Sequence, residues 1–325
     1  MFCTQFAKFL LPFFVVGYWV LGFYPFHWFS PFTIYENAVE KTADGGFSFR
    51  QPGIAHTGSA PSWVKAAIKD NAFEVKLEVL SYNAHQTGPA RIFTLSLDHQ
   101  TRNFTIGQSN ADLVVRLRTS ATGPNGTPEY LVRQVFGDSA IHRVAVRVQP
   151  EEIRIEVDGR QRLIAALPSD ALSTWDAGHW LALGNEFTFQ RPWRGEIREA
   201  IVRVHGAKFD YAAANLRMPN TYQMGTQAFS NELLGAVSIS LEHASLRDRV
   251  VNFVGFAPLG LLLSFVGQKL RSPATTFAWC GLLSLSIETG QLFLEARVAS
   301  TVDVLLNAAG GCVGAWIGSR LQFAS

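Results

Sequence analysis

The sequence predicts a mixed fold class, in which an α-helical transmembrane bundle of about four spans is joined to an all-β antiparallel jelly-roll sandwich. Two observations lead to this prediction. Long apolar stretches with few charges occur near both ends of the chain, whereas the middle alternates apolar and polar residues with a period of two. Hydrophobic residues make up 48% of the 325 residues, and most of the charged residues lie in the middle part.

Four apolar runs are each long enough to cross a hydrocarbon core of ~30 Å as a helix. The first run is longer than the apolar core of a secretory signal and lacks a small-residue cleavage site, so we expect an uncleaved anchor. A net charge of +2 is too small to indicate a nucleic-acid partner. The four runs are residues 9–29, 250–267, 274–294 and 302–319.

Basic residues outside these runs predict the orientation of the chain. Lys8 precedes the first run, Lys269 and Arg271 lie between the second and third, and Arg320 follows the fourth. The positive-inside rule places all of them in the cytoplasm. We therefore expect a multi-pass protein of the bacterial inner (cytoplasmic) membrane, with both termini cytoplasmic and residues 31–247 periplasmic or extracellular.

Polar residues recur at helical spacing in the last three runs. Residues three or four positions apart share one helix face, and acids are costly in hydrocarbon. In the expected orientation these residues all lie near the outer boundary. We therefore expect one outward-facing polar pocket for a polar or lipid-linked headgroup, formed by Asp248, Asn252, Glu288, Gln291, Arg297, Asp303 and Asn307.

Two alternatives remain open for these helices. The first is an intramembrane hydrolase or transferase acting on a lipid-linked glycan or phosphate, with Glu288 and Asp303 as acid and base and Arg297 holding the anionic group. The second is a structural anchor or assembly subunit without chemistry. Polar side chains often bridge membrane helices, and the small-x3-small spacing along residues 310–318 favours close helix packing.

The C-terminal part contains, in order, Asp248-Arg-Val-Val-Asn252, Phe256-Ala-Pro-Leu-Gly260, Glu288-Thr-Gly-Gln291, Arg297, Asp303-Val-Leu-Leu-Asn307 and Gly310-Gly311. This order and spacing resemble the VanZ-like family of bacterial membrane proteins. The resemblance implies an envelope function, since that family is associated with low-level resistance to a glycopeptide antibiotic. The chain departs from the family pattern in its long soluble insert, and it has Arg249 and Asn252 where members often have Lys and His.

The soluble insert alternates most clearly in residues 73–79, 143–148, 153–157 and 195–204, and Asp158-Gly159 is a hairpin signal. Many short strands with one apolar face are typical of an antiparallel sandwich. The motifs Asn103-Phe-Thr-Ile-Gly-Gln108, Val114-Val-Arg-Leu-Arg118 and Trp193-Arg-Gly-Glu-Ile197 resemble laminin-G or concanavalin A-like domains. That resemblance implies carbohydrate binding on a concave face or at loop ends, sometimes with calcium.

Aromatic residues of the insert are the candidate ligand contacts, because exposed rings stack on sugars. They are Trp63, Tyr82, His85 and Trp175, whereas Trp180 and Trp193 lie in strand-like runs and are expected in the core. The sequence has no dense acidic loop and no His-x3-His pair, so we expect no metal and no other cofactor. The expected partners are membrane lipids, an envelope glycan or lipid-linked intermediate, and a membrane protein complex.

These observations predict four parts of the chain. Residues 1–30 form an N-terminal transmembrane helix, and residues 31–206 form the β-sandwich, which binds a glycan or a protein partner. Residues 207–247 form a linker or an interfacial helix. Residues 248–325 form the VanZ-like helical domain with its polar pocket.

Overall fold

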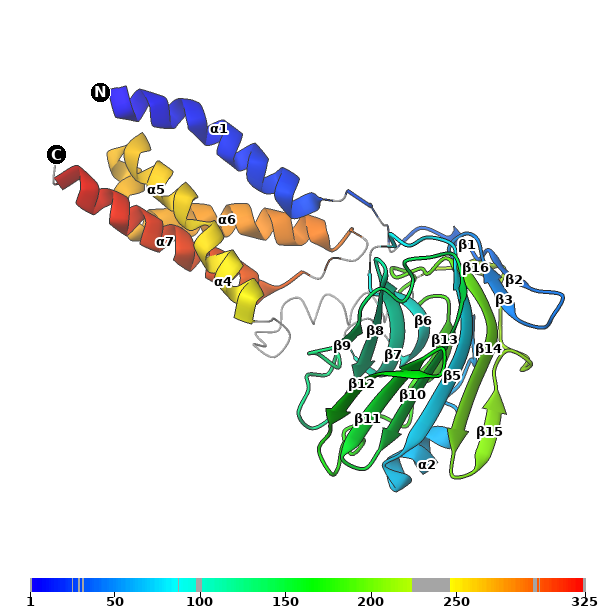
Figure 1. Cartoon of the computed structure of the whole chain (residues 1–325). Helices are drawn as coiled ribbons and strands as arrows, with labels where there is room; N and C mark the ends of the chain where they lie inside the picture. The colour runs from blue at the N-terminus through cyan, green and yellow to red at the C-terminus, as the bar shows by residue number, and fades with distance from the viewer. Residues whose placement is uncertain are drawn as a thin grey trace. The chain divides into compact units, whose positions relative to one another are not determined.

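The computed structural model divides the chain into two compact units (Figure 1). The helical unit comprises Met1–Ser30 and Asn231–Ser325, and the β unit comprises Pro31–Ser230. The structure describes residues 2–323 except 25, 29, 31, 87, 98–100, 224–245, 295–296 and 298, with side chains left out at residues 2–3, 246–248, 271 and 323. The interfacial helix predicted within residues 207–247 falls on residues outside this description.

The described residues of the helical unit include three segments long and apolar enough to cross a membrane, namely Thr4–Phe23, Arg249–Val266 and Thr301–Gln322. A further predicted span, α6, is a continuous helix of 19 residues and stays a prediction as a membrane span. In chain order the helices are α1 (Phe2–Phe23), α4 (Leu246–Gly255), α5 (Ala257–Val266), the 3₁₀ turn η1 (Gln268–Arg271), α6 (Pro273–Gln291) and α7 (Thr301–Phe323).

The second predicted span consists of two helices, α4 and α5, which are separated at Phe256. Pro258 lies in the first turn of α5, where a missing N–H is tolerated because that group has no partner within the helix. A continuous helix would set the proline ring against the carbonyl one turn earlier. The proline therefore explains the break, which the apolar pattern alone did not indicate.

Helix α7 packs against α4, α5 and α6 through a stripe of glycines. A Cβ atom at Gly310 would collide with the carbonyl oxygen of Phe253, and one at Gly314 would collide with that of Ala257. The backbones of α7 and the α4–α5 segment therefore touch directly. This is the close approach that small residues permit between membrane helices, and it agrees with the spacing seen in the sequence.

The β unit is a sandwich of two antiparallel sheets. The eight-stranded sheet has the order β12 (Arg160–Ala166), β11 (Glu152–Val157), β10 (Ile141–Gln149), β5 (Phe73–Ser81), β14 (Gly195–Val204), β3 (Phe47–Phe49) and β2 (Val39–Lys41), with β15 (Ala207–Asp210) beside β14. The six-stranded sheet has the order β4 (Ala55–His56), β13 (Trp180–Leu183), β6 (Ala90–Ser96), β7 (Arg102–Ser109), β8 (Asp112–Leu117) and β9 (Tyr130–Val132).

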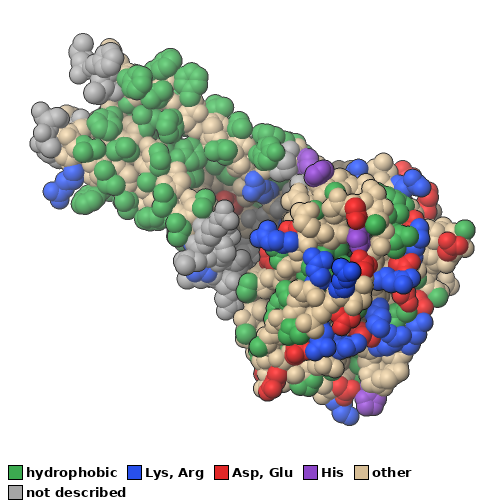
Figure 2. Space-filling model, in the orientation of Figure 1, with side chains coloured by type: hydrophobic (Ala, Val, Ile, Leu, Met, Phe, Trp, Pro, Cys, Tyr) green, Lys and Arg blue, Asp and Glu red, His purple; other side chains and the backbone are tan. Residues whose placement is uncertain are grey.

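Two smaller features complete the β unit. Strand β1 (Tyr35–Glu36) pairs with β16 (Thr221–Tyr222), and the short helix α2 spans Trp63–Asp70. Because β15 and β16 both follow residue 206, the strands of the β unit continue beyond the predicted boundary. In the space-filling view the visible side chains of the helical unit are largely hydrophobic, whereas charged side chains cover the visible face of the β unit (Figure 2).

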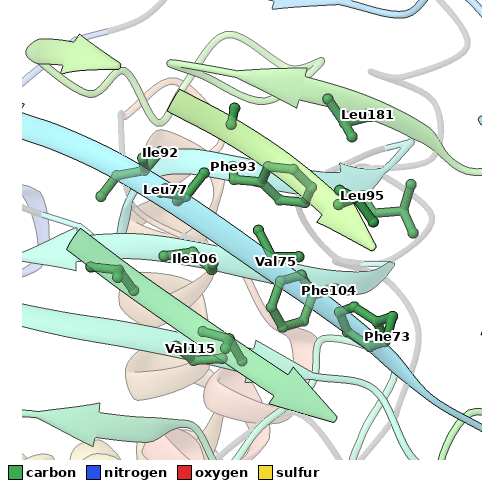
Figure 3. Packing of buried hydrophobic residues seen from close by; sticks show 14 of the residues in the cluster. Phe73, Val75, Leu77, Ile92, Phe93, Leu95, Phe104, Ile106, Val115 and Leu181 are labelled. Atoms are coloured by element: carbon green, nitrogen blue, oxygen red, sulfur yellow. The ribbon is translucent and has the colours of Figure 1, made fainter. Parts of the chain in front are cut away.

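The core of the β unit lies between its two sheets. Strand β5 alternates buried and half-buried residues along its whole length, as its period of two predicts. Its inward side chains meet those of β6, β7 and β8 in one apolar layer. Figure 3 labels Phe73, Val75 and Leu77 of β5 together with Phe93, Leu95, Phe104, Ile106 and Val115 of the facing sheet.

A buried glutamine joins the two sheets beside this core. The Oε1 atom of Gln108 on β7 accepts hydrogen bonds from Ser81 Oγ (2.8 Å), Gln86 Nε2 (3.0 Å) and Trp193 Nε1 (2.8 Å). Its Nε2 atom donates to the backbone carbonyls of Asn83 and Asn110, each at 2.8 Å. A buried amide without partners would be destabilising, so this arrangement fixes the relative position of the strands.

The predicted Asp158-Gly159 hairpin joins β11 and β12. Both residues have positive φ, 53° and 73°, as a two-residue type I′ turn requires. The carboxylate of Asp158 accepts a bond from the backbone N–H of Arg143, and it lies 2.9 Å from Nδ1 of His142. The other ring nitrogen, Nε2, lies 2.9 Å from the carboxylate of Asp138. Burial lowers the pKa of His142, but its bonds to the two carboxylates outweigh burial and raise the pKa above its ordinary value.

Replacing Gly314 with alanine should destabilise the helical unit. The added methyl group would meet backbone atoms that cannot rotate away, and overpacking of this kind costs about 1–3 kcal/mol. Thermal unfolding of the full chain in detergent measures the effect. Gly17→Ala is the matched control, since a Cβ atom there would meet nothing within 4 Å. Equal melting temperatures for the two variants would contradict the close contact.

The contribution of His142 to stability should depend on pH. Because its pKa is raised in the folded chain, its contribution is present below the unfolded value of about 6.5 and is lost as pH rises through the folded value. His142→Gln should therefore lower the melting temperature at pH 6 more than at pH 9, while His85→Gln, which removes an exposed imidazole, should show no such difference. A loss of the same size at both pH values would rule out the charge of His142 as its cause.

Candidate functional site

Polar residues predicted for the helical unit meet where α6 faces α7. Glu288 and Asn307 are buried, and Asp303 is half-buried. The Nδ2 atom of Asn307 donates to Ser284 Oγ at 2.8 Å, and Glu288 Oε2 accepts the backbone N–H of Ser300 at 2.9 Å. Ser300 directly precedes α7, so the Glu288 carboxylate caps the positive end of that helix.

Two other predicted residues donate hydrogen bonds to backbone carbonyls at the C-terminal end of α1. Gln291 Nε2 donates to the carbonyl oxygen of Gly22 at 3.0 Å, and Arg297 Nη2 donates to that of Tyr24. Carbonyls at a helix C-terminus have no partner within the helix, and a cation is favourable there. Arg297 nonetheless lies close enough to Glu288 to act on it electrostatically, as does Asp303.

The remaining predicted residues are less informative. The side chain of Asp248 is outside the described part, and Asn252 is half-buried on α4. Asn307 Oδ1 is a buried acceptor with no hydrogen-bond partner among the described residues.

A cavity of about 460 Å³ lies between α1, α5 and α6, and its lining is almost wholly apolar, with Trp19, Leu259 and Leu282 among its residues. The cavity suits an acyl chain rather than a polar group.

In the β unit, the six-stranded sheet has a polar face directed away from the core. Phe93 and Leu95 of β6 point into the core, so Thr94 between them points outward. The register places Thr94 beside Thr105 of β7, and Thr105 beside Arg116 of β8. We call this surface the outer face. It carries Arg91, Thr94, Ser96, Arg102 and Thr105, which are buried, and Arg116, which is half-buried.

The segment after β13 brings further charges to the outer face. Glu186 is fully buried, and its Oε2 atom accepts a bond from Arg91 Nε at 3.0 Å. Arg191 Nε lies 3.9 Å from the other carboxylate oxygen, and Thr188 Oγ1 donates to it at 3.1 Å. A single carboxylate is thus shared by two guanidinium groups. We call Arg91, Arg102, Arg116 and Arg191 the arginine cluster.

Aromatic residues lie at the β13 side of the same face. The rings of Trp180 and His56 stack with centroids 6.1 Å apart at an interplanar angle of 11°, and Phe187 packs edge-on against both. Trp180 is paired with Ser96, and Ser96 with Arg102. Burial, and then Arg217, lower the pKa of His56, which favours an uncharged imidazole at neutral pH.

Two of the predicted ligand contacts are core residues. Trp63 and Trp175 belong to the main hydrophobic cluster, and their indole N–H groups donate to Tyr211 Oη and the Arg118 carbonyl. Neither ring can therefore stack on a ligand, and the prediction was wrong for both. No pattern in the sequence separated them from surface tryptophans, because neither lies in a clearly alternating strand.

Tyr82 and His85 are exposed. Tyr82 Oη donates to Glu196 Oε2 at 3.3 Å, and the guanidinium of Arg50 lies over its ring.

Trp193 is in the core as expected, but Trp180 is only half-buried. The alternation in Val114–Arg118 places Arg116 on the side of β8 that faces away from the core. This pattern could have indicated the outer face from the sequence.

Solved structures similar to the β unit include laminin and sialidase domains. The LG1-3 region of the laminin α2 chain has a TM-score of 0.36 and 15% identity, covering 61% of this chain and 31% of that chain. The LG4-5 domains of the mouse laminin α1 chain have a TM-score of 0.38 and 12% identity, covering 55% and 48%. The Ruminococcus gnavus IT-sialidase CBM40 has a TM-score of 0.35 and 15% identity, covering 50% and 91%.

The chain thus spans less than half the length of the two laminin structures. The β-sandwich fold is established by the two sheets of this chain and their strand register. No curated protein matches the sequence. The VanZ/LLP1 family model matches residues 199–322, starting within β14 and so earlier than the motif at Asp248. The match includes Glu288 of α6 and Asp303 and Asn307 of α7, which we call the polar cluster. The C-terminal part of the chain therefore contains a VanZ-like domain, which the family model matches over residues 199–322.

Proposed function

We propose that this protein is a membrane-anchored binding protein of the bacterial cell envelope, whose β unit captures a glycan on its outer face. The helical unit supplies the anchor through its candidate spans. The positive-inside pattern of Lys8, Lys269 and Arg320 supports an inner-membrane location with the β unit outside the cytoplasm.

One observation carries the glycan proposal. Trp180 is a half-buried indole at the edge of the polar outer face, where it is paired with Ser96. The hydroxyl groups of Ser96, Thr94 and Thr105 are buried and bonded to one another. Binding sites for small molecules combine aromatic walls with a few well-placed polar groups. A sugar ring offers an apolar face to an indole, so it fits beside Trp180.

Trp180→Ala should weaken glycan binding. A stacked ring contributes about 0.5–1.5 kcal/mol beyond its buried area, which corresponds to a loss of roughly threefold to tenfold in affinity. A glycan array probed with the full chain in nanodiscs identifies a ligand, and titration with that ligand measures the change. Tyr82→Ala, at an exposed aromatic residue on the other sheet, is the control. Loss of binding in Tyr82→Ala but not in Trp180→Ala would move the site away from the outer face.

A second candidate function concerns the helical unit. We infer that its polar cluster receives a donor group of a lipid or lipid-linked headgroup. The buried Oδ1 atom of Asn307, which has no hydrogen-bond partner in the described part of the chain, supports this inference. The apolar cavity between α1, α5 and α6 suits the accompanying acyl chain. Most hydrogen bonds of the neighbouring polar side chains join one helix to another. These bonds support the anchoring role equally well.

Asn307→Leu should separate these two roles. Its bond to Ser284 is of a kind that averages about 0.6 kcal/mol between membrane helices, so the variant should fold normally but retain at least several-fold less of a specific lipid. Mass spectrometry of lipids that copurify with the full chain gives the readout. Gln291→Leu, which removes a comparable bond to α1, should change stability as little as Asn307→Leu does and leave the bound lipid unchanged. Unchanged lipid in both variants would leave only a packing role for Asn307.

A further inference from the structure

Arg102 is a buried arginine whose charge is not matched by a salt bridge to any acid among the described residues. Its side chain is 1% exposed, and it lies on the outer face beside Ser96. Its Nε and Nη1 atoms are buried and have no hydrogen-bond partner in the described part of the chain. A guanidinium carries five N–H donors in a rigid fork and stays protonated in proteins, so such a position is costly unless something accepts those donors.

The neighbouring acids that the structure describes, Glu186 and Glu129, already interact with other arginines. Glu186 is bonded to Arg91 and lies near Arg191. Glu129 lies 3.5 Å from Arg116 Nη2, and Arg116 Nη1 also donates to Asn125 Oδ1 at 3.2 Å. Across the described residues, no acid forms a salt bridge with Arg102 of the kind that Arg91, Arg116 and Arg191 each make.

The electrostatic surroundings of Arg102 are strongly positive. Burial lowers its pKa well below the ordinary value, and the nearby charge of Arg91 lowers it further, with smaller effects from Arg116 and Arg191. Glu186 acts in the opposite direction. The guanidinium of Arg102 therefore lies within range of three other cations and one buried acid, an environment that attracts an anion.

The geometry of the outer face indicates what carries that anion. Trp180, Ser96 and Arg102 occupy paired positions on three adjacent strands, β13, β6 and β7. Neighbouring strands are about 4.8 Å apart, so Trp180 and Arg102 are separated by about 10 Å. One short oligosaccharide can reach both positions. Trp180 is half-buried, and the side chain of Arg116 is 14% exposed, so both extend from the buried cluster toward solvent.

We propose that the arginine cluster is the anion subsite of the glycan site, and that the ligand of the β unit is an acidic oligosaccharide whose carboxylate or sulfate group binds Arg102. The subsite rests on the proposed glycan-binding function and names its ligand class. The guanidinium fork matches both oxyanions through paired N–H···O bonds. The indole of Trp180 holds the sugar itself.

Binding by the full chain in nanodiscs tests this proposal, with hyaluronan tetrasaccharide as the carboxylate probe and its carboxyl-reduced form as the neutral match. A sulfated chondroitin tetrasaccharide and its desulfated form distinguish sulfate from carboxylate. We expect at least one acidic probe to bind at least tenfold more tightly than its match. Arg102→Gln should remove that preference, and Arg143→Gln, at an exposed arginine of the other sheet, should leave it unchanged.

Thermal unfolding separates ligand binding from a purely structural role. Without ligand, Arg102→Gln should melt at or above the wild-type temperature, because the variant removes a buried cation that lacks acceptors. With the acidic probe, the melting temperature should rise for the wild type and not for Arg102→Gln. A lower melting temperature together with unchanged affinity would make Arg102 structural and overturn the proposal.

The remaining outcomes distinguish this inference from the proposed function. Equal binding of acidic and neutral probes, with sensitivity to Trp180→Ala alone, would overturn the anion subsite and keep the glycan function. Absence of binding to every glycan on the array and to all four probes would overturn both.

Discussion

Both units of this protein are organised by one constraint, which is that a polar group removed from water must find a hydrogen-bond partner. In the β unit, Gln108 satisfies both ends of its amide and joins the sheets in doing so. In the helical unit the same constraint acts at helix ends. Glu288 bonds the N–H that precedes α7, and Arg297 bonds a carbonyl just after α1. Polar side chains that looked like a pocket in the sequence thus also hold the helices together.

Close backbone packing makes those bonds possible. The glycines of α7 let it touch α4 and α5 directly, and α6 then lies close enough to α7 for Asn307 to reach Ser284. Lipid tails are as apolar as the helices themselves, so contact and hydrogen bonding, rather than the hydrophobic effect, drive this association. The glycine stripe and the polar bonds are therefore parts of one packing arrangement.

Each proposal begins from a group that departs from the constraint. Asn307 Oδ1 and the Nε and Nη1 atoms of Arg102 are buried without a hydrogen-bond partner among the described residues. An acceptor of this kind suits a donor on a headgroup, and a guanidinium suits an oxyanion. They lie in different units, so each can be tested by itself.

The sequence by itself determined the strands and the candidate membrane spans. The period of two in residues 195–204 predicted β14 with the bounds that the structure has, and Asp158-Gly159 predicted its hairpin because a type I′ turn needs two residues that tolerate positive φ. The VanZ-like motif identified the C-terminal domain. These features follow from local chemistry, which is written in consecutive residues. Only the tertiary structure decided which tryptophans are buried and which arginines meet. Trp63 and Trp175 lie in the core, while Arg91, Arg102 and Arg116 gather on one face. These relations depend on strand register and on how distant segments cover one another, and a single sequence does not state either.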